Sequence, residues 1–112
     1  MPPLGTSTSV FGGVLNDAQL DALERSSVTC IEIVGLPQDQ IERTHIRDRL
    51  AAARFRINSA HLPYGRALDV SQLDPAARAN ALETNVANLR LANSLGAGLV
   101  VVHPSAEPIA DE

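Results

Sequence analysis

Two histidines each end an apolar run of the sequence and stand within two residues of a proline. His61 is followed by Leu62-Pro63, and His103 is followed directly by Pro104. Proline has no backbone N–H and cannot continue a strand ladder, so each histidine is expected at the mouth where its strand ends. An imidazole at that place can bind a divalent metal, hydrogen-bond a sugar hydroxyl or transfer a proton.

A carboxylate adds to this pair. Glu32 lies within the apolar run Cys30-Ile31-Glu32-Ile33. Two imidazoles and a carboxylate have the donor types that zinc or manganese takes, so these residues are the candidate catalytic and metal-binding set. Because Glu32, His61 and His103 are far apart in the sequence, other roles for these residues remain open. Each histidine could be only a hydrogen-bonded strand end, and Glu32 could form an ion pair with Arg56 or Arg66.

Two aromatic residues are candidates for contact with a substrate. Tyr64 follows the His61-Leu62-Pro63 turn and could stack on a sugar ring or simply pack within its loop. Phe11 precedes Gly12-Gly13 in a turn that could line a pocket. The spacing of these glycines matches neither a dinucleotide-binding nor a P-loop motif, and no Gly-x-Ser-x-Gly elbow is present.

Composition excludes several classes of protein. The chain has 112 residues, of which 45% are apolar, and a net charge of −4. All nine basic residues are arginine, which excludes a Schiff-base lysine, and an acidic chain without a basic block argues against nucleic acid as a partner. A single cysteine excludes a multi-cysteine zinc site. With no long apolar stretch and no basic leader, we expect a cytoplasmic protein with no membrane partner.

Strands and helices alternate in the predicted order β-α-β-α-β-α-β. Runs rich in β-branched residues predict four strands, over Leu4–Val10, Val28–Val34, Ile57–Leu62 and Gly98–His103. The segments between the strands have helical character and good caps. The first helix begins at Asn16 or Asp17, the second covers Gln38–Arg54, and the third starts from Asp74-Pro75 and ends before Gly96.

The apolar faces of two helices can be read from their spacing. The first helix carries Leu20 and Leu23 on one face. In the third helix, Leu82, Val86 and Leu89 recur at intervals of four and three residues and predict the face that lies on the sheet.

This order predicts an α/β fold with parallel strands. Residues 1–112 are interpreted as a single domain that is either parallel (β/α) units 1–4 of a TIM barrel, a half-barrel, or a small open doubly wound sheet. A complete barrel typically has ~250 residues, and the predicted fourth strand has no helix after it. We therefore expect a fragment or truncated form of a longer barrel, or a half-barrel that self-association completes by burying its open edges.

The chain resembles the N-terminal half of the sugar-phosphate isomerase/epimerase family, the xylose-isomerase-like TIM barrels whose superfamily includes the apurinic endonucleases. The matching segments are Leu4–Thr8, Cys30–Ile33, Ile57–Tyr64 and Leu91–Pro104. The last segment, a helix ending in Leu-Gly-Ala and a strand ending in His-Pro, is the most specific. The resemblance covers residues 4–105.

The resemblance implies metal-dependent proton transfer on a sugar or keto-acid. It places His61 and His103 at the ends of the third and fourth barrel strands, as metal ligands or substrate contacts. Glu32 as the third catalytic candidate, and Phe11 and Tyr64 as substrate contacts, are expected from their places in the sequence alone. The divalent metal (Mn, Zn, Mg or Co) of a complete barrel is held mainly by residues of strands five to eight. A 112-residue monomer is therefore expected to be inactive and to hold no complete metal site.

Two other functions remain open. The chain could be a non-catalytic half-barrel module whose main property is self-assembly into a homodimer or a larger oligomer. It could also be a zinc-dependent hydrolase similar to the apurinic endonucleases. The net charge of −4 and the lack of basic patches argue against binding to DNA.

Overall fold

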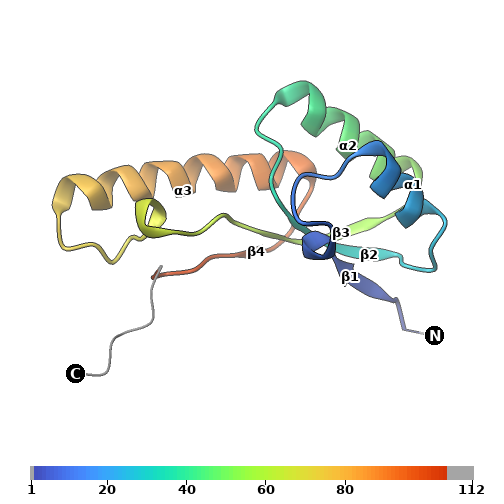
Figure 1. The fold of residues 1–112 in the computed structure, drawn as a ribbon, viewed down its shortest axis with the longest axis horizontal. Coiled ribbons are helices and arrows are strands. Elements are labelled where there is room, and N and C mark those ends of the chain that lie inside the picture. The colour runs from blue at the N-terminus through green and yellow to red at the C-terminus, as the bar shows by residue number, and fades with distance from the viewer. Residues whose placement is uncertain (1, 106–112) are drawn as a thin grey trace.

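Four short parallel strands lie side by side in the order in which they occur in the chain (Figure 1). The computed structural model describes residues 2–105. Within this range the strands are β1 (Gly5–Ser7), β2 (Cys30–Val34), β3 (Arg56–His61) and β4 (Val100–Val101). They alternate with the helices α1 (Asp17–Glu24), α2 (Gln40–Ala52) and α3 (Pro75–Leu95), and the 3₁₀ helices η1 (Thr8–Phe11) and η2 (Arg66–Leu68). The predicted α/β class and parallel pairing are confirmed.

All three α-helices lie on the same side of the sheet (Figure 1). Ile31 and Ile33 of β2 are buried beneath them, whereas Glu32 between them is half-buried on the opposite, bare face. A doubly wound sheet has helices on both faces and a reversal in strand order. The described residues show neither, because each connection steps one strand further in the same direction. In this part of the chain the sheet is therefore singly wound rather than doubly wound, an arrangement compatible with either a half-barrel or a small open sheet.

Local capping interactions set the starts of the three α-helices. Asn16 accepts a hydrogen bond from the backbone of Gln19, whose side chain accepts one in return, which forms a capping box. Asp39 caps α2 and Asp74 caps α3 in the same way, by accepting from the backbone N–H three residues later. Gly96 ends α3 in the left-handed conformation with φ of 92°. The predicted caps at Asn16, Asp74 and Gly96 are confirmed.

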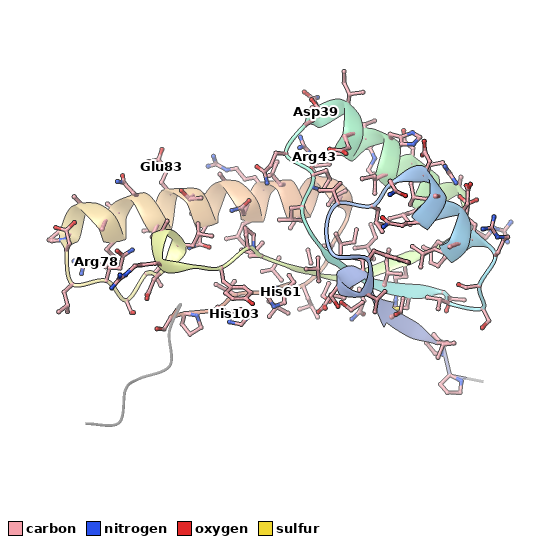
Figure 2. The ribbon with its side chains drawn as sticks, in the orientation of Figure 1. Asp39, Arg43, His61, Arg78, Glu83 and His103 are labelled. Carbon is pink, nitrogen blue, oxygen red and sulfur yellow. The ribbon has the colours of Figure 1, made fainter. Side chains whose placement is uncertain are left out.

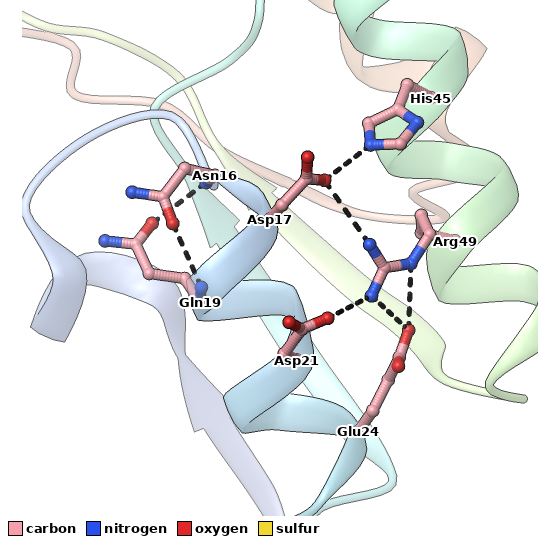
Figure 3. A network of polar contacts seen from close by, with 7 residues as sticks. All are labelled: Asn16, Asp17, Gln19, Asp21, Glu24, His45 and Arg49. Carbon is pink, nitrogen blue, oxygen red and sulfur yellow. Dashed lines mark hydrogen bonds and ion pairs between the residues drawn. The ribbon is translucent and has the colours of Figure 1, made fainter.

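A network of charged side chains joins α1 to α2 (Figure 3). The Arg49 guanidinium donates to Glu24 and Asp21, both at 2.8 Å, and to Asp17 at 3.3 Å. Asp17 also lies 2.7 Å from His45 Nε2. Beneath this exposed layer, apolar side chains of the three α-helices, the sheet and the residue after β3 form the core, which includes Leu20, Leu23, Ile31, Ile33, Ile46, Leu50, Ala60, Leu62 and Leu95.

The buried face of α3 differs from the predicted one. Leu82 is 57% exposed and Leu89 is 39% exposed. The residues that face the sheet and the preceding loop are Ala81, Asn85, Asn88, Ala92 and Leu95. The buried stripe is thus one residue out of phase with the most apolar one, because small side chains allow close packing and the two buried asparagines have hydrogen-bond partners.

Strand lengths also differ from the predicted runs. The first run, Leu4–Val10, leaves the sheet after Ser7, because the Ser7 hydroxyl caps η1 by accepting from the backbone of Ser9. The fourth strand is confined to Val100–Val101, so His103 lies two residues beyond its end. No helix in the described part of the chain is both long and apolar enough to cross a lipid bilayer.

Candidate functional site at the carboxyl ends of the strands

A pocket of about 320 Å³ opens beyond the carboxyl ends of β2 and β3. This is the edge at which parallel α/β folds bind ligands. Its walls come from the loops that follow β1, β2 and β3, and are lined by Gly12, Gly13, Val34, Gly35, Leu36, His61, Leu62, Pro63 and Tyr64. Apolar side chains and glycine backbone therefore form most of the lining, and His61 supplies an ionisable group.

Glycine and threonine hold the first two of these loops together. Gly35 has a φ of +82°, and a Cβ atom on it would lie 2.7 Å from the carbonyl carbon and oxygen of Gly13. Only glycine allows this approach of the two loops. The fully buried Thr8 hydroxyl accepts from the backbone N–H of Val34 at 2.8 Å and donates to its carbonyl at 3.1 Å. Sequence patterns did not reveal Thr8 or Gly35, because both act through contacts with segments distant in the chain.

The two histidines singled out from the sequence meet at this site. Nε2 of His103 lies 3.1 Å from Nε2 of His61, although the residues are 42 positions apart. Nδ1 of His61 lies 2.9 Å from the Leu62 carbonyl. A proton on Nδ1 therefore donates to this carbonyl, which leaves Nε2 of His61 as an acceptor for the N–H of His103. Figure 2 shows the pair on the side of the strands away from α3.

Tyr64 completes a cluster of three rings. It stacks on His103 with ring centroids 4.3 Å apart and an interplanar angle of 19°. It meets His61 edge-on, with centroids 6.0 Å apart. The structure thus places Tyr64 beside both histidines and in the lining of the pocket.

Glu32 is on the bare face of the sheet but lies deeper than the histidine pair. Its neighbour two residues on, Val34, is the register partner of His61, so Glu32 lies roughly 7 Å back along the strand direction. Its carboxylate accepts a hydrogen bond from the Ser7 hydroxyl at 2.8 Å. Among the ion pairs of the described residues there is none to Arg56 or Arg66.

Phe11 and His45 lie outside the ring cluster. Phe11 packs against the hydrophobic core, and the glycines that follow it, Gly12 and Gly13, line the pocket in its place. His45 lies on an exposed part of α2 beside Asp17.

At this site two imidazoles, side chains of a type that can bind a metal, come together, and among the described residues no group of three or more histidine, cysteine, aspartate or glutamate side chains is arranged so that it could hold a metal ion. The chain matches no known protein-family model and no curated protein. The site therefore has to be interpreted from its own geometry.

Proposed function

We propose that this chain is (β/α) units 1–4 of a TIM barrel of the sugar isomerase/epimerase type, and that His61 and His103 are two ligands of its divalent metal. The sequential strand order and the helices on one face support a barrel segment, in which the bare face corresponds to the interior. The observation that carries the proposal is the meeting of His61 and His103 at the strand ends.

The geometry of the pair fits two ligands of one ion. Imidazole nitrogens that bind the same tetrahedral zinc ion at ~2.0–2.1 Å lie roughly 3.3 Å from each other, and the two Nε2 atoms are 3.1 Å apart, so a small shift would admit the ion. The hydrogen bond of His61 Nδ1 to the Leu62 carbonyl is the kind of contact that orients a metal-ligating imidazole. His103 would need its proton on Nδ1 to present a free Nε2. The remaining ligands would come from groups outside the described residues.

A divalent metal at this place would polarise the oxygens of a sugar or keto-acid and so acidify the neighbouring C–H group. The side chains of this chain would bind and orient the substrate. Tyr64 offers its ring to an apolar sugar face, and the glycine loops allow close approach of the ligand to the backbone. Glu32, whose carboxylate is already held by Ser7, is the proposed proton acceptor deeper in the barrel. Phe11 would act by supporting the glycine turn.

Metal titration tests the proposal directly. We expect calorimetry with zinc, and the visible absorption of bound cobalt, to show weak binding at one site per chain in the wild type, because the two histidines are only part of a complete ligand set. His61→Ala and His103→Ala should each weaken binding at least tenfold. His45→Ala is the matched control and should bind as the wild type does, because His45 belongs to the helical layer, where it contacts Asp17 of α1. Equal weakening by all three variants, or no binding to the wild type, would contradict the proposal.

Assays of sugar isomerisation and of binding to abasic DNA distinguish the isomerase proposal from the endonuclease-like alternative. The isomerase proposal places activity in the complete eight-unit barrel, so we expect none from a monomer of this chain and conversion of sugars or keto-acids with manganese when the barrel is completed. For the endonuclease-like alternative, binding to abasic DNA would be required. Lack of such binding at low salt would end that alternative, since phosphate contacts are strongest there.

A self-assembling half-barrel is the second candidate function. It is favoured by exposed apolar side chains at the open edge: Leu99 is 65% exposed, and Val101 and Val102 of the same segment are also exposed. If chains associate through this edge, Leu99→Glu should lower the apparent mass measured by light scattering. Leu73→Glu, in a loop where Leu73 is almost fully exposed, should leave it unchanged. A wild type that stays monomeric at high concentration would refute self-assembly.

A further inference from the structure

The stacked position of Tyr64 needs an explanation, because burial does not provide it. Tyr64 is 61% exposed and belongs to the long connection between β3 and α3. An exposed ring on a long connection gains little from packing and loses conformational entropy when it is held in one place. Another contact is therefore expected to hold the connection between β3 and α3 in the position in which Tyr64 stacks on His103.

Asn85 of α3 makes the contact that can do so. Its side chain is almost fully buried, and its Nδ2 group donates to the carbonyls of Ala81 and Leu68, both at 2.9 Å. The bond to Ala81 stays within α3. The bond to Leu68 leaves the helix and holds η2, which begins two residues after Tyr64.

Two hydrogen bonds hold the half of this connection that leads into α3: Arg78 donates to the Gln72 carbonyl, and Gln72 donates to the Asp69 carbonyl. In the half that carries Tyr64, Asn85 bonds the Leu68 carbonyl from the helix. A buried amide group destabilises the fold unless both of its N–H hydrogens are bonded. The side chain of Asn85 is therefore held in the one orientation that reaches both carbonyls.

We propose that Asn85 is a positioning residue that holds Tyr64 against His103 by fixing the Leu68 carbonyl. In this way a side chain on the helical layer shapes the ring cluster on the other side of the sheet. The relevance of the cluster to catalysis rests on the function proposed above, whereas the link from Asn85 to Tyr64 does not depend on any metal or substrate.

Tyr64 provides its own probe, since the chain has one tyrosine and no tryptophan. In the wild type, the stacked imidazole is expected to quench tyrosine emission, and the fixed ring to give a near-ultraviolet circular dichroism signal. His103→Ala sets the level of emission without the stack. We expect Asn85→Ala to raise emission to that level and to lose the near-ultraviolet signal, with far-ultraviolet circular dichroism unchanged.

Two further variants separate positioning from general loss of stability. Asn85→Ser retains a hydroxyl that can bond the Ala81 carbonyl within the helix but is too short to reach Leu68, so it should also release Tyr64 even if Asn85→Ala does not fold. Asn88→Ala is the matched control. Asn88 is equally buried on the same face of α3, yet its Oδ1 accepts from the side chain of Gln38, at 3.5 Å, in the loop before α2. It should keep the wild-type emission.

Two results would overturn the proposal. Asn85 does not position the ring if folded Asn85→Ser keeps the quenched tyrosine emission, or if Asn88→Ala raises the emission as much as Asn85→Ser does. Metal affinity, measured on the same variants, reports separately on the function. If the wild type binds no metal, the metal site is contradicted. The positioning role would still be supported if Asn85→Ser raises the Tyr64 emission and loses the near-ultraviolet circular dichroism signal.

Discussion

Replacement of Gly35 by alanine should destabilise the fold through two separate terms. Gly35 has a φ of +82°, and an L-residue in this left-handed region costs about 1–2 kcal/mol. The added Cβ would also lie 2.7 Å from the Gly13 backbone, so the loops after β1 and β2 must separate. Overpacking of this kind costs about 1–3 kcal/mol. We therefore expect a total loss of roughly 2–5 kcal/mol for Gly35→Ala.

Gly12→Ala provides the matched control for this prediction. Gly12 has a similar φ of +76°, but a Cβ atom there meets nothing within 4 Å. It should lose only the conformational term, about 1–2 kcal/mol. Urea unfolding followed by far-ultraviolet circular dichroism gives both free energies of unfolding. If Gly35→Ala costs no more than Gly12→Ala, the two loops do not approach each other as described, and the wall of the pocket is built differently.

Three other predictions concern the layers that support the site. Leu20→Ala should lose about 2–5 kcal/mol in urea unfolding, because Leu20 is buried in the core. Asp74→Ala should cost about 0.5–2 kcal/mol by removing the cap of α3, whereas Asp74→Ser should be nearly neutral. The hydrogen bond with His45 lowers the pKa of Asp17 below its ordinary value of 3.8. This contribution to stability is therefore complete above that pH and is lost as pH falls through the folded-state pKa. His45→Ala should make the acid side of the stability profile less steep, and an unchanged profile would exclude this contact.

The helix ends could be predicted because they depend on residues close together in the chain. Asn16 and Asp74 cap backbone groups three residues away, and Gly96 supplies a left-handed residue at the end of α3. The buried face of α3 could not be predicted in the same way. Its most apolar stripe contains Leu82 and Leu89, yet partners elsewhere in the fold favour the stripe that contains Asn85.

Residue order was enough to predict the alternating strands and helices, and to predict His61 and His103 at the ends of strands whose parallel pairing follows from that alternation. Periodicity, caps and prolines are local signals, so they need no knowledge of the rest of the fold. Three features could be seen only in the folded chain: the sheet is singly wound, two imidazole nitrogens 42 residues apart lie 3.1 Å from each other, and Glu32 lies deeper than this pair. Such distances depend on strand register and on the path of each loop, which are set by packing between segments remote in the chain.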